Sequence, residues 1–251
     1  LIQGFLAPLA AGFPGAFGLQ DDCALLTPEP GTELVLKTDP VAAGVHFLPD
    51  DAPEDIAWKA LAANVSDLAA KGAQPLAYLM ALALPAAPTR DWMRRFAAGL
   101  RQAQETFGCH LIGGDTDKTT GPLTISITVI GVVPAGMMVR RATARAGDHL
   151  YVTGSIGDAA LGLRLLRDPG LAARWGLDAA AAAYLEKRFL RPQPALSIRT
   201  ALRAHASAAM DLSDGLVKDL DRMCRASGTA ARVDADRVPL SAPAKAVVCA
   251  S

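Results

Sequence analysis

The sequence predicts a protein of the α/β and α+β classes, built as two domains. Segments typical of strands alternate with segments typical of helices along the whole chain, which favours mixed sheets covered by helices. The 251 residues, 51% hydrophobic and 20% charged, are enough for two cores of ordinary composition. A stretch rich in proline, glycine and basic residues, 134–154, separates the two halves.

We assign residues 1–136 to an N-terminal α/β domain. The sequence of this first half predicts six elements. They are, in order, a strand at 32–41, a helix at 54–72, a strand at 78–85, a helix at 88–108 and strands at 109–114 and 123–133. The strands are apolar runs or alternate between apolar and polar residues. Gly72 closes the first helix, and the second carries apolar residues at steps of three and four.

The second half, residues 137–251, is assigned to a C-terminal α+β domain. Its predicted elements are a strand at 149–154, helices at 157–168 and 178–190, a strand–turn–helix unit over 208–228, and a strand with a turn at 230–241. The runs "HLYVTG" and "AARVDADRVPLS" favour strands because β-branched and aromatic residues occur in them.

Composition excludes several classes of function. The chain has 25 basic and 25 acidic residues and only 5% aromatic residues, so neither a charged surface nor stacking platforms for nucleic acid are expected. Glycine and proline interrupt the apolar first stretch, which therefore predicts neither a signal peptide nor a membrane span. Four widely spaced cysteines favour buried thiols over disulfides or a zinc site, and we expect a soluble protein of the cytoplasm.

Five motifs place aspartates where predicted strands end or turn. They are "QDDCALL", "KTDP", "NVSDLAAKG", "IGGDTD" and "MDLSDG". Several carboxylates that converge on one cleft repel each other unless cations bridge them, and such hard oxygen ligands select Mg²⁺. For any single aspartate, however, a turn former or helix cap is the simpler interpretation. Asp67 has a further alternative, an exposed ion pair with Lys71 four residues on.

Two glycine-containing turns accompany these motifs. The turn "IGGDT" allows close approach of the backbone to a ligand, and "SDGL" opens a helix whose N-terminus favours phosphate. Neither GxxxxGK[ST] nor GxGxxG occurs, so the usual P-loop and dinucleotide folds are not expected.

Taken in order, the motifs resemble the thiamine-monophosphate kinase family over nearly the whole chain. The resemblance rests on "DDCALL", "KTDPVAAGVHFLPD", "WKALAANVSDLAAKGAQP", "LIGGDT", "RRATARAGDHLYVTGSIGDAALGL", "RPQP" and "MDLSDGLVKDL". It implies the two-domain fold of aminoimidazole ribonucleotide synthetase, which selenophosphate synthetase and the hydrogenase maturation ATPase share. The fold implies a homodimer that pairs through the N-terminal domain.

The resemblance also implies a reaction and a site. ATP would phosphorylate thiamine monophosphate to thiamine diphosphate by direct in-line transfer, with several Mg²⁺ ions and no covalent nucleophile. The implied ATP contacts are Gly114, Asp115, Arg141 and Ser213, and His46 would contact the thiamine phosphate. The implied metal ligands are Asp22, the backbone of Lys37, Thr38, Asp39, Asp67, Asp115, Asp211 and Asp214.

Several features depart from the family pattern. Lys37 stands where the family usually has a small residue, and a strand would place its ammonium on the same face as Asp39. Pro40 replaces a usual threonine, and family members continue well past "VPLS". Three alternatives therefore stay open: an ATP-dependent enzyme of the same fold with another substrate, a Mg-ATP-binding protein without catalysis, and a metal-dependent phosphatase.

Overall fold

The structure is a computed structural model, and it describes residues 1–250. The chain divides into two compact units. Unit 1 comprises residues 1–138 and 194–204, and unit 2 comprises residues 139–193 and 205–251. The chain therefore leaves unit 1, returns to it for a short segment, and leaves it again. The predicted domain boundary after residue 136 stays a prediction.

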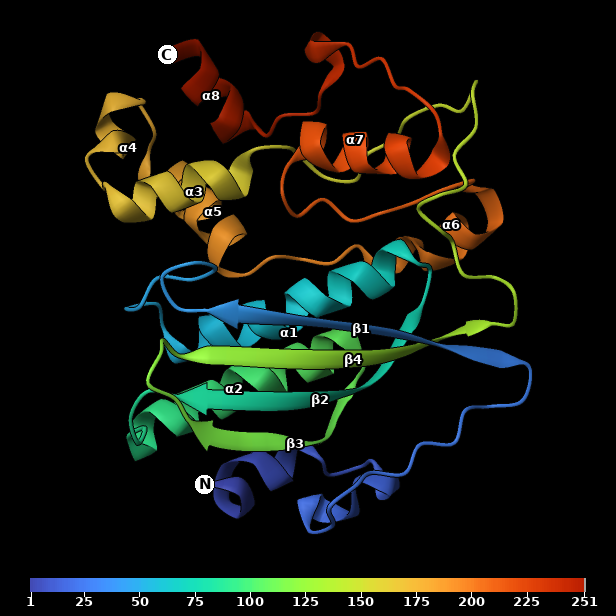
Figure 1. Ribbon diagram of the computed structural model, residues 1–251. Coiled ribbons are helices and arrows are strands. Elements are labelled where there is room, and N and C mark those ends of the chain that lie inside the picture. Colours follow the sequence, from blue (N-terminus) through green and yellow to red (C-terminus); the bar gives the residue numbers. More distant parts are fainter. Residues whose placement is uncertain (251) are drawn as a thin grey trace. The chain divides into compact units, whose positions relative to one another are not determined.

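Unit 1 is a four-stranded mixed sheet with two long helices on one face (Figure 1). The strands β1 (Thr32–Ala42), β2 (Gln74–Leu84), β3 (His110–Lys118) and β4 (Thr124–Pro134) lie in the order β1-β4-β2-β3. β4 pairs antiparallel with β1 and β2, whereas β2 and β3 are parallel. The helices are α1 (Pro53–Ala70) and α2 (Arg90–Phe107). All six elements predicted for this half are confirmed within a few residues.

The main core lies between the sheet and the two helices. On β1 and β4 residues with odd numbers, such as Val35, Val41 and Ile127, face the helices, whereas on β2 residues with even numbers, such as Met80 and Leu82, do so. The helices cross closely at Gly99, where an added Cβ would lie 2.3 Å from the carbonyl oxygen of Glu54. Gly72 has a φ of +71° directly after α1, as expected for the residue that closes a helix.

The N-terminal residues form three short helical turns, η1 (Ile2–Leu6), η2 (Ala7–Leu9) and η3 (Pro14–Leu19), which the sequence did not predict. They lie beside β3 (Figure 1). Ala16 packs with Ala77, Ile112 and Ile130 in a second, smaller core. The returning segment supplies η4 (Leu196–Ile198) and most of α6 (Arg199–His205), in which Arg203 donates a hydrogen bond to the Gly72 carbonyl.

Unit 2 is helical in the residues that the structure describes. Its elements are α3 (Asp158–Arg167), α4 (Leu171–Arg174), α5 (Ala179–Leu190), α7 (Leu216–Ser227), η5 (Ala235–Arg237) and α8 (Ala242–Ala250). Leu165, Trp175, Leu185 and Val247 form its core. The predicted helices at 157–168 and 178–190 and the helix that ends at Gly228 are confirmed.

The strands predicted at 149–154, before "MDLSDG" and at 230–241 are wrong for the described residues, which are extended or irregular there apart from the turn η5. A strand requires a neighbouring ladder, but these segments make single bonds. The Ala209 N–H donates to the Arg140 carbonyl, and the Ile156 N–H donates to the Pro239 carbonyl.

The four cysteines are all free, as expected, although Cys23 and Cys249 are exposed and only Cys109 is buried. Burial raises the pKa of the Cys109 thiol to about 12. Among the helices of residues 1–250, none combines the length and apolar character that a membrane crossing requires.

Candidate functional site

The most closely knit group of predicted site residues in unit 1 is Lys37, Asp39 and Asp67. Lys37 and Asp39 are two residues apart on β1, so both side chains face α1, which carries Asp67. The Lys37 Nζ lies 2.9 Å from Asp39 Oδ2 and 3.1 Å from Asp67 Oδ2. The ammonium therefore bridges the two carboxylates.

Lys37 is charged in this arrangement. Partial burial opposes the ammonium form, but hydrogen bonds and charge interactions with Asp39 and Asp67 outweigh this effect and raise the pKa of Lys37 above its ordinary value. Asp67 is the most enclosed of the three, with 16% of its side chain exposed, against 31% for Lys37 and 54% for Asp39. The Asp39 carboxylate is thus the one most open to a ligand.

Asn64 of α1 fixes the backbone of this group. Its Oδ1 accepts the Asp39 N–H at 2.9 Å, and its Nδ2 donates to the Asp39 carbonyl at 3.3 Å and to the Ala60 carbonyl at 3.1 Å. The Asn64 side chain is fully buried. An asparagine, a poor residue for a helix interior, is therefore used here to attach the edge strand β1 to α1.

The Thr38 side chain lies on the opposite face of the sheet. The hydroxyl of Thr128, its direct neighbour on β4, donates to Thr38 Oγ1 at 3.0 Å. The structure therefore does not bring the Thr38 hydroxyl to the Lys37–Asp39–Asp67 group.

Gly114 and Asp115 lie on β3, the opposite edge of the sheet from β1. The register places Asp39, Ile127, Met80 and Gly114 in one row across the sheet. Asp39 and Gly114, at the two ends of this row, are three strand spacings apart, a distance of about 14 Å. Asp39 and Asp115 of one chain thus lie too far apart to bind a single Mg²⁺ ion, whose ligands are about 2.1 Å from the metal.

The local structure of β3 explains why position 114 is a glycine. Gly114 has a φ of +143°, and an added Cβ would lie 1.9 Å from the Met80 carbonyl oxygen. The close approach predicted for "IGGDT" is therefore made to the neighbouring strand β2. Asp115 is exposed, and its Oδ1 accepts the N–H of Thr116 at 2.7 Å.

His46 follows β1 in an exposed turn. Its Nδ1 accepts the Ala42 N–H at 3.0 Å, so a neutral ring carries its proton on Nε2. The His46 carbonyl accepts from the Nζ of Lys59 at 3.1 Å. Lys59 is only 7% exposed, and burial lowers its pKa to about 8 against the opposing effect of Asp51 and Asp55. Asp22 lies in an exposed bend after η3.

Three of the four predicted site residues of unit 2, Asp211, Ser213 and Asp214, lie in the loop before α7. Oδ2 of the fully buried Asp219 accepts the N–H groups of Ser213, Asp214 and Gly215 at 2.9, 2.8 and 3.2 Å. These three N–H groups are therefore already used within the loop, although Ser213 itself is exposed, and the expectation that this helix N-terminus favours phosphate stays a prediction. Asp219 Oδ1 accepts from Arg222 at 2.9 Å.

The Asp214 carboxylate is also paired within the helix that follows it. Its Oδ2 lies 2.9 Å from Lys218 Nζ and 2.7 Å from Arg222 Nη1. Hydrogen bonds from both lower the pKa of Asp214. Arg141 is exposed, and its carbonyl accepts from the Ser227 hydroxyl at 3.0 Å. Asp211 is partly exposed.

Two important residues were missed by the sequence analysis. Asp219 stands in the first turn of α7, where acidic residues favour a helix N-terminus, and that position is the signal that would have found it. Asp158 begins α3 and is 1% exposed. It accepts hydrogen bonds from Ser155, from Tyr184 of α5 at 3.0 Å and from Ser241 before α8 at 2.6 Å. Ser155 is only three residues away, but Tyr184 and Ser241 lie too far along the sequence for their contacts to be predicted from spacing.

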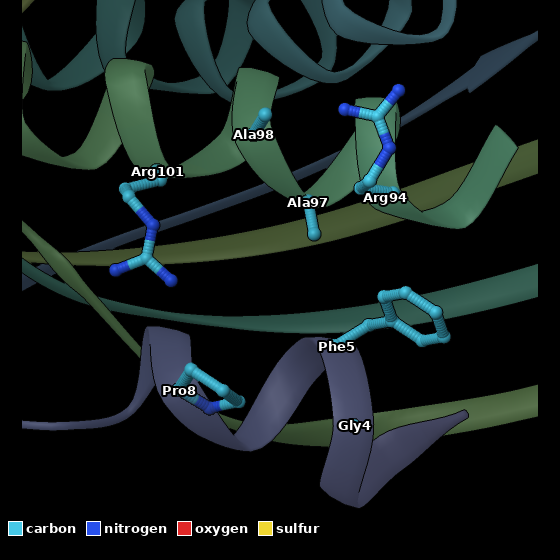
Figure 2. Close-up of a pocket in the computed structure, with 7 residues that line it drawn as sticks. All are labelled: Gly4, Phe5, Pro8, Arg94, Ala97, Ala98 and Arg101. Atoms are coloured by element: carbon cyan, nitrogen blue, oxygen red, sulfur yellow. The ribbon is translucent and has the colours of Figure 1, made fainter. Parts of the chain in front are cut away.

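A cavity of about 190 Å³ lies between the N-terminal turns and α2 (Figure 2). Phe5 and Pro8 line it on one side, and Arg94, Ala97 and Arg101 line it on the other. It contains no predicted site residue.

Aspartate oxygens are ligands of the type that Mg²⁺ prefers, and this chemistry fits Asp22, Asp115 and Asp211. It does not fit the Asp39–Asp67 pair, which already holds the Lys37 ammonium. Across residues 1–250, no three His, Cys, Asp or Glu side chains gather closely enough to hold a metal ion.

Family models match both halves of the chain. Residues 20–133 match the AIR synthase related protein, N-terminal domain, and residues 145–248 match the corresponding C-terminal domain. The mixed sheet covered by two helices and these two matches define an AIR synthase related protein.

Individual relatives show to which family within this class the chain belongs. A curated thiamine-monophosphate kinase from Caulobacter vibrioides is 42% identical over 245 residues, which are 98% of this chain and 67% of that protein. The crystal structure of the thiamine-monophosphate kinase from Stenotrophomonas maltophilia K279a superposes with a TM-score of 0.81 at 41% identity, over 90% of this chain and 70% of that one. The chain belongs to the thiamine-monophosphate kinase family.

A third similar structure is AaThiL complexed with AMPPCP and TMP. It has a TM-score of 0.79 and 33% identity, and the match covers 86% of this chain and 68% of that one. The present chain thus spans about two thirds of the length of its relatives.

Proposed function

We propose that this chain transfers the terminal phosphoryl group of ATP to the phosphate of thiamine monophosphate, which yields thiamine diphosphate and ADP. The observation that carries the proposal is the 42% identity to a curated thiamine-monophosphate kinase over nearly the whole chain. The AaThiL complex with AMPPCP and TMP supports the choice of ATP as the phosphoryl donor and of thiamine monophosphate as the acceptor. No observation favours a second function.

The transfer is direct, from one phosphate to the other. Such a reaction needs alignment of the reacting groups and neutralisation of their spread negative charge more than it needs covalent chemistry. We assign Gly114, Asp115, Arg141 and Ser213 to ATP, as the family resemblance implies. Arg141 has an exposed side chain and offers a forked cationic contact to phosphate oxygens.

His46 is assigned to the phosphate of thiamine monophosphate. Because Nδ1 is occupied by the Ala42 N–H, the group that His46 offers a ligand is the Nε2–H donor. Lys59 holds the carbonyl of the same residue, so the turn presents the ring in one orientation.

Magnesium belongs to the proposal as well. We assign it to the carboxylates of Asp22, Asp115 and Asp211, whereas Asp39, Asp67 and Asp214 already pair with basic side chains. A Mg²⁺ ion held by these carboxylates would supply positive charge that offsets the negative charge of the phosphates. The protein's own part is to hold the carboxylates at fixed backbone positions.

A homodimer is the proposed assembly, formed through the sheet face of unit 1 that is opposite to α1 and α2. Leu34, Leu36 and Leu79 on this face are 37%, 62% and 37% exposed. Burial of such side chains against a second copy would stabilise a dimer.

A product assay tests the function. The protein is mixed with Mg²⁺, ATP and thiamine monophosphate, and thiamine diphosphate and ADP are quantified. We expect equal amounts of the two products. Asp115→Asn should lower kcat/KM at least about 100-fold because it removes charge from the phosphate site.

The chain provides a matched control in Asp117→Asn. Asp117 is also exposed on β3, and its Oδ1 accepts the next N–H at 2.7 Å, just as that of Asp115 does. It should retain near-normal activity. Inorganic phosphate in place of thiamine diphosphate would indicate a phosphatase. Binding of Mg-ATP without turnover would indicate a non-catalytic protein, and turnover only with another acceptor would indicate a different substrate.

A further inference from the structure

We propose that the Lys37 ammonium permanently occupies the place of one divalent cation between Asp39 and Asp67, so that this carboxylate pair binds no metal ion. The inference deepens the proposed function and rests on it only for the expectation that the pair belongs to the phosphate-binding site. The geometry of the three side chains carries it.

The ammonium takes the position that a bridging cation would need. Nζ contacts the Oδ2 atoms of both carboxylates, at 2.9 and 3.1 Å. A Mg²⁺ ion bound to the same two oxygens, at about 2.1 Å from each, would lie within about 5 Å of Nζ. A doubly charged ion would therefore be held beside a fixed positive charge.

The group cannot easily open to admit both cations. Asn64 binds the N–H and the carbonyl of Asp39, and it lies on α1 three residues before Asp67. The two aspartates are thereby fixed to one another through α1. Lys37 reaches them from the same face of the same strand as Asp39.

The exchange also changes the charge of the site. Two carboxylates with one ammonium have a net charge of −1, whereas two carboxylates with Mg²⁺ would be neutral. The chain is therefore expected to bind one metal ion fewer than a chain with a small neutral residue at position 37. The ammonium needs no ion from solution, so its positive charge is present at every Mg²⁺ concentration.

Metal binding in the absence of nucleotide tests this inference directly. Free Mn²⁺ is measured by electron paramagnetic resonance during titration of the whole chain to several millimolar, above the weak-site range of about 10⁻³ M. We expect Lys37→Met to bind one Mn²⁺ ion per chain more than the unaltered protein. The double variant Lys37→Met/Asp67→Asn should lose this additional ion.

Lys245→Met is the matched control, because it removes one positive charge from an exposed position in the other unit. It should leave the Mn²⁺ stoichiometry unchanged. Lys37→Thr serves as a second variant, and circular dichroism establishes that each variant is folded.

Two results would overturn the inference. One is equal Mn²⁺ binding by the unaltered protein and by the folded Lys37 variants. The other is the loss of one Mn²⁺ ion when Asp67→Asn is introduced with Lys37 in place. Because no substrate is present, the result is independent of the product assay: a chain that makes no thiamine diphosphate but gains an ion in Lys37→Met contradicts the proposed function alone.

Discussion

At the scale of single residues, buried polar side chains in this chain act mainly on the backbone. Asn64 pairs with both backbone groups of Asp39, and Asp219 accepts three N–H groups of one loop. The buried polar atoms of Asn64 and Asp219 are thereby paired, as their low exposure requires. The backbone at Asp39 and at Asp214 is therefore held in place by buried polar side chains.

The composition of α1 indicated that Asn64 has a role, but not which one. Helix propensity shows that an interior asparagine is unfavourable, whereas its partner on β1 lies 25 residues away and depends on the fold. The placement of Lys37 and Asp39 on one face could be predicted, since it follows from strand alternation alone.

Lys59 provides a prediction about pH. Its pKa is about 8 in the folded protein, against an ordinary value of 10.5 in the unfolded chain, so between these values the unfolded chain binds more protons. Stability contributed by this residue therefore rises with pH. The free energy of unfolding of the unaltered protein, minus that of Lys59→Met, should increase by about 1 to 2 kcal/mol from pH 8 to pH 9.5 in urea titrations. A difference that stays constant or falls would contradict the assigned burial effect.

At the scale of elements, local patterns predicted the helices well and the strands unevenly. The amphipathic helix α2 was predicted almost to its ends, because its periodicity and its closing glycine, Gly108, are local signals. The strands of unit 1 have partners, but the similar runs in unit 2 have none among the described residues. Strand propensity without a partner does not make a sheet.

The connection between α7 and the loop before it can be tested with two aspartates on the same helix. Asp219→Asn removes the charge of a fully buried carboxylate that accepts three N–H groups and pairs with Arg222, whose side chain is 42% exposed, and should destabilise the protein by about 2 kcal/mol. Amide hydrogen exchange at residues 213–215 should become faster at the same time.

Asp221→Asn is the control, because Asp221 also pairs with an arginine, Arg225, but is 54% exposed. We expect a change below about 0.5 kcal/mol and unaltered exchange in the loop. Equal effects of the two substitutions would show that the contacts of Asp219 do not order residues 213–215.

At the scale of the whole molecule, the proline- and glycine-rich stretch predicts a domain boundary after residue 136, and this boundary stays a prediction. The return of residues 194–204 to unit 1 was not predictable. It depends on contacts such as the hydrogen bond from Arg203 to the Gly72 carbonyl, which no local sequence pattern predicts. The site assignments likewise came from matched motifs, whereas the separation of Asp39 from Asp115 across the sheet required the strand order.

The proposed dimer can be tested at one position of its exposed sheet face. Leu36→Glu places a charge on that face and should weaken dimerisation at least about tenfold, an effect of about 1.4 kcal/mol, in sedimentation velocity. Leu25→Glu is a matched control, because Leu25 and Leu36 are both 62% exposed. A monomeric unaltered protein, or equal effects of both changes, would contradict an interface at Leu36.

The return of residues 194–204 to unit 1 has a consequence for the protein while it is being made. The Gly72 carbonyl at the end of α1 accepts a hydrogen bond from Arg203, 131 residues later. At a ribosomal rate of about 5–20 residues per second, this partner is added roughly 10 seconds after Gly72. Nearly all of unit 1 therefore emerges and can begin to fold before its last piece exists, and an intervening stretch of unit 2 must be synthesised first.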